Sequence, residues 1–435
     1  MIDSLLRHFN ERRKLFQSPI DLEPLARPTL PISGFKVVAQ SSFIGEENVA
    51  VPNIGFIYCF FESTLQFDGN TGVQRTARQT ARALMEYGCK VIATTWDKDV
   101  ESLAPLTPKE LLHLSKWDGP STDQWHQWVN PKFSPDNSWL MSNEMPPNLG
   151  PGINCKLINF AKANNMKTAV TFFDAIPCLL LNLYPAGSYQ LHFSYMKQLT
   201  EWDLIFPISE QSANDMLALL SELDIDQQLL IPKLKPLRLP TEFHGSPRKM
   251  NYPIVLNARP FILVLSTFEK RKNHLTLFRA IEIAQRSFTF GFDLILVGHP
   301  LETEVVKLAN QYQRKFPSIR IEHNASDQQL QDLFDRADFT IYPSIEEGFG
   351  LPIAESIWNG KPVICDKFRA INDLASEGGC LQVDVLNAEE FADAIVTLAT
   401  NLEIYRLKLA EIDARAFITW ADYVSNINFA MSNAI

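Results

Sequence analysis

YPSIEEGFGLPIAESIWNGKPVICD, residues 342–366, carries the local pattern that decides the fold of the second half of the chain. The apolar run FTIYPS, which overlaps its start, predicts a buried strand, LPIAESIW predicts a helix and KPVICD predicts a second strand. Gly348 and Gly350 permit tight backbone geometry in the loop, and Pro352 suits the first turn of a helix. A strand, a helix and a strand in this order form the unit that builds parallel sheets.

The start of the predicted helix offers a place for an anion. Helix N-termini expose unpaired N–H groups that favour negative charge, so the amides of Phe349, Gly350 and Leu351 are candidates to bind a phosphate. Glu347 and Glu355 are eight positions apart, one in the loop and one about a turn into the helix, and both can point at one ligand. Because an acidic residue near a nucleotide typically hydrogen-bonds the ribose hydroxyls, the segment predicts a nucleotide site.

The same alternation of apolar strands and amphipathic helices extends through both halves of the chain. FILVLST, FDLILVG and IRIEHN read as strands in the second half, and IGFIYCFF, KVIATTW, KTAVTFFDAIP and DLIFPIS read as strands in the first. Residues 231–260 hold six prolines, which is typical of a connection between domains. The sequence therefore predicts an α/β protein with two Rossmann-like domains facing across a cleft, with ligands beyond the carboxyl ends of the strands.

The domain boundaries follow from these patterns. Four tryptophans lie among several prolines between residues 100 and 150, and the sequence leaves open whether they are core residues or a sugar platform. The expected units are an N-terminal extension with an amphipathic helix (1–50), a first Rossmann-like domain with the Trp-rich insertion 100–150 (51–240), a linker (241–260), a second Rossmann-like domain (261–410) and a C-terminal helix that packs back on the first domain (411–435).

Composition excludes several functional classes. The 435 residues include 50 acidic and 40 basic side chains, a net charge of −10, which argues against general nucleic-acid binding. The six cysteines form no CxxC pair, which is typical of reduced thiols and predicts a cytoplasmic protein. No segment reaches about 18 uncharged apolar residues, so we expect no membrane-spanning helix.

Residues 1–16 show helical periodicity. Ile2, Leu5, Leu6 and Phe9 share one face, with basic residues nearby. Such a helix either makes peripheral contact with a partner or with the inner face of the membrane, or packs on the surface of its own domain.

A second candidate site lies after the strand FILVLST. Arg271 and Lys272 stand at a strand-to-helix junction, where cations can neutralise a phosphate leaving group. Preorganised charge of this kind is often the largest single contribution to catalysis. We therefore expect both side chains to face the same cleft as Glu347.

The segment 342–366 resembles the signature of retaining glycosyltransferases of the GT-B fold, family 4, in which two glutamates separated by seven residues flank an FGLP core. The resemblance implies that Glu347 contacts the donor sugar, that the amides of residues 349–351 bind the diphosphate, and that Glu355 binds the ribose. The stretch at Arg271 and Lys272 resembles the "RKN" of the family. The family has Gly-Arg or Gly-Thr before this stretch, and Ser266-Thr267 resembles the Gly-Thr variant with serine in place of glycine. The missing arginine leaves Arg271 and Lys272 to hold the diphosphate.

Three segments outside that signature resemble the same family. Residues 70–75, NTGVQR, resemble a "TGIQR" loop that lies under the donor phosphates in a subset of its members, which implies substrate-binding roles for Thr71, Gly72 and Arg75. Arg75 either binds a phosphate or the acceptor, or only begins a helix. Gly298, after the strand LILV, matches a family glycine and is a further substrate-binding candidate.

Asp174 lies in the third segment, at the end of the strand KTAVTFF. A subset of the family has His-Asp-x-Ile-Pro here, and Phe173 replaces the histidine. By this resemblance Asp174 positions the acceptor hydroxyl or steadies an oxocarbenium-like sugar. The alternative is a buried, hydrogen-bonded aspartate in a turn.

The resemblance implies a retaining glycosyltransferase. It would move a hexosyl unit, mannosyl- or rhamnosyl-like, from a nucleotide diphosphate sugar to a hydroxyl of a glycan or lipid-linked acceptor. We expect no metal and no other cofactor, because the two DxD patterns, at 97–99 and 224–226, are short matches of the kind that occur by chance. The alternatives are a sugar-nucleotide hydrolase or epimerase, and a non-catalytic GT-B subunit that stabilises a partner transferase.

Overall fold

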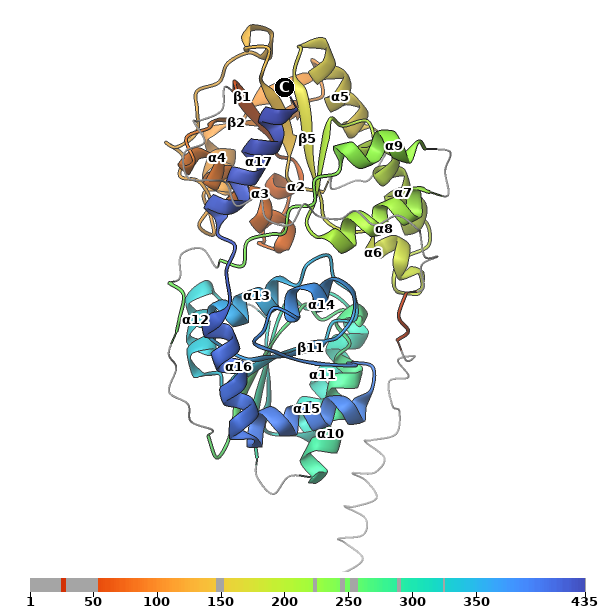
Figure 1. Cartoon of the computed structure of the whole chain (residues 1–435), viewed down its shortest axis with the longest axis vertical. Helices are drawn as coiled ribbons and strands as arrows, with labels where there is room; N and C mark the ends of the chain where they lie inside the picture. The colour runs from red at the N-terminus through yellow and green to blue at the C-terminus, as the bar shows by residue number, and fades with distance from the viewer. Residues whose placement is uncertain are drawn as a thin grey trace, which may run out of the picture.

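The computed structural model describes residues 25–28, 54–145, 152–221, 225–242, 247–250, 257–287, 291–323 and 325–434. The helix predicted within residues 1–16 lies outside these ranges, as do Asp224 and part of the predicted linker. The described residues form two lobes stacked along the long axis of the molecule (Figure 1).

The N-terminal lobe is a twisted sheet covered by helices. Its strand order is β3-β2-β1-β4-β5-β6, and every pair is parallel except β2 with β3. The strands are β1 (Phe56–Phe60), β2 (Lys90–Asp97), β3 (Ser102–Pro105), β4 (Trp139–Ser142), β5 (Lys167–Phe172) and β6 (Leu204–Pro207). The helices are α2 (Ser63–Gln66), α3 (Gly72–Glu86), α4 (Pro108–Leu114), α5 (Ile153–Ala163), α6 (Ile176–Leu179), α7 (Ser188–Leu199), α8 (Glu210–Leu220) and α9 (Gln227–Leu230), with 3₁₀ turns η1 (Pro131–Phe133), η2 (Leu181–Leu183) and η3 (Ile231–Lys233).

The end of the predicted insertion 100–150 is not an insertion. Residues 139–142 form β4, which pairs with β1 on one side and β5 on the other and so lies in the middle of the sheet. Trp139 is fully buried there. The strand is only four residues long and follows a proline-rich stretch, so its apolar run is too short to stand out in the sequence.

The C-terminal lobe is a second sheet, with the order β12-β11-β10-β7-β8-β9 and parallel pairing throughout. Its strands are β7 (Phe261–Leu265), β8 (Asp293–Val297), β9 (Ile319–Glu322), β10 (Phe339–Tyr342), β11 (Val363–Asp366) and β12 (Cys380–Val383). Its helices are α10 (His274–Ser287), α11 (Thr303–Lys315), α12 (Asp327–Arg336), α13 (Leu351–Trp358), α14 (Arg369–Ala375), α15 (Ala388–Thr400) and α16 (Leu402–Ala414), with the 3₁₀ turn η4 (Lys270–Lys272).

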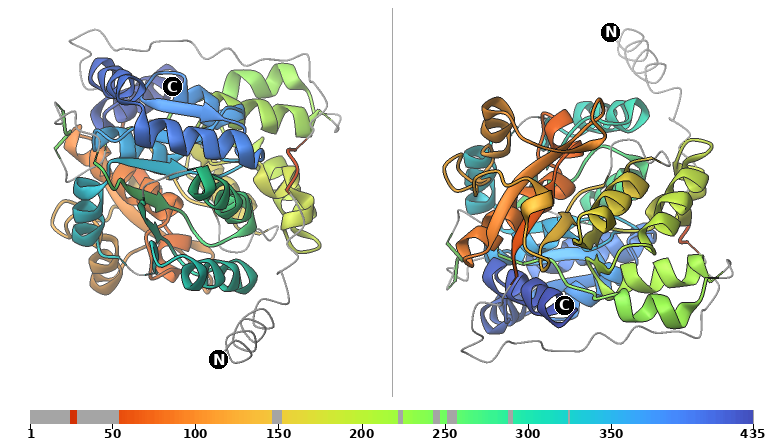
Figure 2. Two further views of the ribbon diagram at one scale, coloured as in Figure 1. Left: turned by 90° about the horizontal axis from the view of Figure 1, so that it is seen from below. Right: turned by 90° about the horizontal axis from the view of Figure 1, so that it is seen from above.

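The chain crosses between the lobes at two neighbouring places. After α16 it returns to the N-terminal lobe, where α17 (Trp420–Asn433) packs against α3 (Figure 1). The backbone N–H of Thr241 donates to the carbonyl of Ile418 at 3.0 Å, so the forward and return crossings lie side by side. Figure 2, which looks along the axis joining the lobes, shows the two sheets overlapping in projection. The two crossings therefore connect the lobes along the same side of the cleft.

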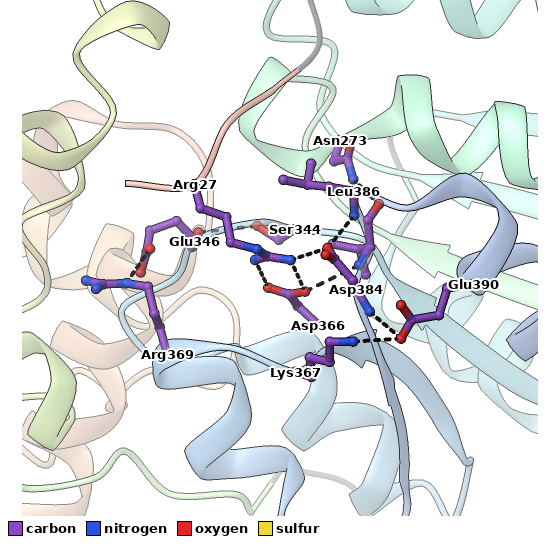
Figure 3. Close-up of polar contacts among 11 residues, drawn as sticks. Arg27, Asn273, Ser344, Glu346, Asp366, Lys367, Arg369, Asp384, Leu386 and Glu390 are labelled. Carbon is purple, nitrogen blue, oxygen red and sulfur yellow. Dashed lines mark hydrogen bonds and ion pairs between the residues drawn. The ribbon is translucent and has the colours of Figure 1, made fainter. Parts of the chain in front are cut away.

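Residues 25–28 lie on the C-terminal lobe, at the carboxyl ends of β11 and β12. The guanidinium of Arg27 donates to Asp366, at 2.5 and 2.8 Å, and to Asp384 at 2.5 Å, and it lies 3.8 Å from the ring centroid of Phe368 (Figure 3). Burial raises the pKa of Asp366, and Arg27 opposes that rise. Residues 25–28 are therefore tied to the C-terminal lobe, although residues 54–242 of the N-terminal lobe follow them in the sequence.

Candidate functional site

Glu347 is the centre of a buried cluster of charges in the C-terminal lobe. Its Oε1 accepts from Nη1 of Arg271 at 2.6 Å, from Nζ of Lys272 at 2.5 Å and from Oγ of Ser344 at 2.5 Å. Burial acts to raise the pKa of Glu347, but Arg271 and Lys272 outweigh it and hold that pKa well below its usual range. The carboxylate therefore stays charged and keeps both cations at the strand end.

The turn η4 places those two cations. Asn273 ends it with φ = 52°, a left-handed conformation that asparagine tolerates, and its Nδ2 donates to the carbonyl of Val385 at 2.8 Å. Arg271 also donates to Glu269 at 2.8 Å and to the carbonyl of Glu346 at 2.7 Å. Burial and the charge of Arg271 lower the pKa of Lys272. Both cations are thus oriented before any ligand arrives.

The N-terminus of α13 faces the N-terminal lobe at close range. Gly350 caps the helix with φ = 103°, a conformation that favours glycine, and Pro352 follows in the first turn. A Cβ at Gly348 would lie 2.6 Å from the carbonyl oxygen of Phe173, and a Cβ at Gly72 would lie 3.0 Å from Cδ1 of Leu351. The predicted loops of the two lobes therefore meet, and the close approach of the Phe173 backbone requires a glycine at position 348.

Glu355 lies on α13 and forms an ion pair with Arg75 of α3, across the two lobes. The pair lies in a cavity of about 190 Å³ between the lobes. The lining includes Asn70, Gln79 and Trp117 from the N-terminal lobe and Gln328, Gln331, Leu351 and Glu355 from the C-terminal lobe. Three of the predicted substrate-binding residues, Arg75, Leu351 and Glu355, therefore line one cavity.

Asp174 lies at the end of β5, beside the loop that carries Glu347. Its Oδ1 accepts from the backbone N–H of Ile176 at 2.9 Å, and its carbonyl oxygen is 2.8 Å from Nε2 of His192. A Cβ at Gly348 would lie 3.1 Å from that of Asp174. Burial raises the pKa of Asp174, and the charge of Arg271 opposes that rise. The carboxylate is therefore both a turn residue and a group within electrostatic reach of the Glu347 cluster.

Two predicted substrate-binding residues have structural partners. Gly298 donates its N–H to the carbonyl of Glu322 at 3.0 Å, and a Cβ there would collide with the carbonyl of Ser266 at 1.8 Å. Thr71 holds the N-cap position of α3 with its hydroxyl bonded to Gln74. The close approach at Gly298 explains why that position holds a glycine, whatever it contacts in addition.

An ion cluster that the sequence did not predict links the lobes next to Glu347. Nη2 of Arg369 donates to both carboxylate oxygens of Asp215 on α8, at 2.7 and 2.8 Å, and its Nε lies 2.5 Å from Oε2 of Glu346. Figure 3 shows the contact between Arg369 and Glu346. Burial raises the pKa of Glu346 to about 7 although Arg369 acts to lower it. Nothing in the local sequence signals this pairing, because its members are far apart in the chain.

The C-terminal lobe is similar to a known protein family. Residues 259–401 match the family model of Glycosyl transferases group 1. The chain is 29% identical over 133 residues to O-antigen chain mannosyltransferase B of Escherichia coli, a match that covers 29% of this chain and 35% of that protein. The matched part is therefore about a third of the length of that relative.

Solved structures extend the similarity to both lobes. A glycosyltransferase from Rickettsia africae has 18% identity and a TM-score of 0.57, covering 87% of this chain and 98% of that one. HepE from Anabaena, solved in complex with UDP-glucose, has 15% identity and a TM-score of 0.57, and the match also covers 87% of this chain and 98% of that one. The two six-stranded sheets and these neighbours confirm the predicted α/β, two-domain GT-B fold.

None of the helices in the described part of the chain is long and apolar enough to cross a bilayer. None of its groups of three or more His, Cys, Asp or Glu side chains is arranged to hold a metal ion.

Proposed function

We propose that the chain is a retaining glycosyltransferase of family 4 that transfers a hexosyl unit from a nucleotide diphosphate sugar to a hydroxyl of a glycan or lipid-linked acceptor. The observation that carries the proposal is the buried cluster of Arg271 and Lys272 on Glu347, 2.5 to 2.6 Å from its Oε1, beside the N-terminus of α13. A fixed cation pair next to free helix amides is suited to a diphosphate.

The donor would lie mainly in the C-terminal lobe. Its diphosphate would accept from the amides of residues 349–351 and from Arg271 and Lys272, and its ribose would donate to Glu355. An ionised carboxylate has about four acceptor positions, so Glu347 can hold its cations and still accept from a sugar hydroxyl. The cation pair takes the role that a metal has in other transferases, which supports a metal-independent reaction.

The acceptor would approach from the N-terminal lobe, near Asp174. Its hydroxyl oxygen forms the new bond to the anomeric carbon while the bond from that carbon to the phosphate oxygen breaks. Attack from the face of the leaving group retains the anomeric configuration, and the hydroxyl proton passes to the departing phosphate oxygen. Arg271 and Lys272 stabilise the charge that develops on the diphosphate. Closure of the two lobes over the bound substrates would exclude water from this step.

The sugar is proposed by analogy. The mannosyltransferase relative supports a mannosyl-like unit, and the UDP-glucose complex of the structural neighbour supports a nucleotide diphosphate donor in the cleft. Resemblance of residues 70–75 to the "TGIQR" loop supports a place for the donor phosphates next to α3.

The proposal is tested by a thermal-shift screen of GDP-, UDP- and dTDP-sugars, followed by product analysis with and without acceptor. A donor present at about 100 times its Kd stabilises the folded state by about 2.7 kcal/mol, which a thermal shift detects. Release of free sugar without acceptor would support the hydrolase alternative. Donor binding without turnover, with a partner that co-purifies, would support a non-catalytic subunit. No shift with any nucleotide sugar would refute the proposal.

A further inference from the structure

Trp117 and Trp420, the first residue of α17, are the two aromatic residues among the described residues that line the cavity between the lobes, and only Trp117 belongs to the Trp-rich region 100–150. Trp117 follows α4 in the N-terminal lobe and shares the cavity with Glu355 of α13 and with Gln328 and Gln331 of α12. Two other tryptophans of the same region pack elsewhere: Trp125 lies edge-on to Phe61 at 5.8 Å between centroids, and Trp128 lies edge-on to Tyr58 at 6.1 Å.

The backbone at Trp117 is held in an unfavourable conformation. Trp117 and Asp118 have φ values of 52° and 55°, consecutive left-handed residues that are not glycine. The carbonyl of Asp118 accepts from Nε2 of Gln79 at 3.1 Å and from Nη1 of Arg82 at 2.9 Å, both on α3. Such strain persists only where the surroundings enforce it, and it gathers at binding sites.

A buried arginine lies beneath the ring. Arg78 of α3 has no exposed surface, and its guanidinium carbon lies 4.7 Å from the ring centroid of Trp117. Its Nη1 donates to Asn70, a lining residue, at 3.1 Å, whereas its Nε and Nη2 have no hydrogen-bond partner within the described residues. Burial lowers the pKa of Arg78, and the carboxylates of Glu144 and Asp68 oppose that change without forming a hydrogen bond to it among the described residues. A buried guanidinium with donors left unpaired is costly, so this placement indicates a function for the ring it supports.

We propose that Trp117 forms the N-terminal wall of the nucleoside pocket and stacks on the base of the donor, and that Arg78 is its positioning residue. This inference rests on the proposed function. The proposed diphosphate site is at residues 349–351 and the proposed ribose site is at Glu355, so the base extends into the cavity that Trp117 lines. Gln328 and Gln331 of α12 line the opposite wall, where Nε2 of Gln328 donates to Asp332 at 2.9 Å and Nε2 of Gln331 donates to Asn359 at 2.9 Å.

The arrangement also couples binding to lobe closure. Glu355 belongs to the C-terminal lobe and Trp117 to the N-terminal lobe, so a nucleoside held by both bridges the cleft. A ligand that contacts both lobes in only one of their arrangements stabilises that arrangement.

The test compares ligands with and without a base on the full chain. UDP, GDP, ADP, dTDP and inorganic pyrophosphate are titrated by calorimetry against wild type, Trp117→Ala, Trp117→Phe and Arg78→Met. We expect Trp117→Ala to weaken the best nucleoside diphosphate about tenfold or more, as loss of a stacked base does, with pyrophosphate unchanged. Trp117→Phe, which keeps an aromatic face, stays within about threefold of wild type. Arg78→Met lowers the ratio of nucleotide to pyrophosphate affinity, which a general loss of stability would leave unchanged.

Tryptophan fluorescence gives a second readout with a matched control. Nucleotide quenching present in the wild type should be reduced in Trp117→Phe, with the remainder coming from Trp420 in the same cavity, and kept in full in Trp128→Phe, whose ring packs on Tyr58. Unchanged nucleotide affinity in a folded Trp117→Ala, equal weakening of nucleotide and pyrophosphate, or an effect confined to the acceptor KM would each overturn the inference while leaving the proposed function standing. A wild-type chain that binds no nucleotide would overturn both.

Discussion

The two glutamates of the C-terminal lobe, eight positions apart, differ in where their partners come from. Glu347 is hydrogen-bonded by Arg271, Lys272 and Ser344, all from its own lobe. Glu355 is paired with Arg75 from the other lobe. The environment of Glu347 is therefore formed within one lobe, whereas that of Glu355 depends on the position of the two lobes relative to each other. In the proposed reaction, charge stabilisation is preformed and nucleoside binding is tied to closure.

The largest expected effect comes from the cation pair. Lys272→Ala removes one of the two charges from the proposed leaving-group site, and we expect kcat to fall about 100- to 1000-fold, the size seen when one preorganised group is lost. The Arg271→Ala, Lys272→Ala double variant should fall further. The measurement is sugar transfer from the donor identified by the screen.

Lys270→Ala is the matched control for that experiment. Lys270 lies in the same turn, but it is exposed and paired with Glu304 at 3.3 Å, away from Glu347. It should keep the wild-type rate. Near-wild-type transfer by the double variant would remove Arg271 and Lys272 from the mechanism.

The next effect concerns the ion cluster that joins the lobes. Arg369→Ala leaves Asp215 and Glu346, 6% and 1% exposed, without their cation, and breaking a buried pair costs about 3 kcal/mol or more of unfolding free energy. Urea unfolding measures the change. Arg259→Ala is the control, because its pair with Asp293 is exposed and should contribute less than about 1 kcal/mol. Equal losses in the two variants would mean that Arg369 is no more important than a surface charge.

The fold and the Glu347 cluster differ in how far the sequence could predict them. Long apolar runs such as Phe261–Leu265 and Asp293–Val297 carry enough signal for strands, so the two sheets were predictable. Four-residue β4 was misassigned because a run that short is outweighed by its proline-rich flank. A local motif could name Glu347, Arg271 and Lys272 but not the hydrogen bonds among them.

Contacts between distant segments could not be predicted from the sequence. Arg369 is 154 positions from Asp215, and Arg27 is 339 positions from Asp366, so no local pattern records either pair. Both pairs join segments whose positions depend on the packing of complete lobes. Trp117 shows the same limit: four tryptophans looked alike in sequence, and only the cavity separates Trp117 from those that pack on Phe61 and Tyr58.

A pH titration separates Glu346 from its neighbour Glu347. The folded-state pKa of Glu346 is raised to about 7, so its contribution to stability is fully present below its unfolded pKa and is lost as pH rises through 7. Wild type should therefore lose about 2 kcal/mol relative to Glu346→Gln between pH 5 and pH 8. Urea unfolding of both proteins at each pH gives the difference. A difference that does not change with pH would show that Arg369 keeps Glu346 ionised throughout.

The smallest effect is expected at the pair that crosses the cleft, and it tests the comparison most directly. Arg75 and Glu355 have side chains 24% and 9% exposed, close to those of Arg369 and Asp215. Arg369, however, also pairs with Glu346. The coupling of Arg75 with Glu355 in a double-mutant cycle of Arg75→Met and Glu355→Gln should therefore be about 1 to 2 kcal/mol of unfolding free energy, below the loss expected for Arg369→Ala. A ribose hydroxyl can replace Arg75 as the partner of Glu355 when the ion pair is weak. Arg75→Met should therefore keep nucleotide affinity within about threefold of wild type. Glu355→Gln should weaken nucleotide affinity about tenfold, because the ribose loses a charged acceptor. A coupling above about 2 kcal/mol would mean that the pair itself holds the lobes together. Glu355 would then be a structural residue like Arg369, and the nucleoside would have to displace a strong interaction before it could bind.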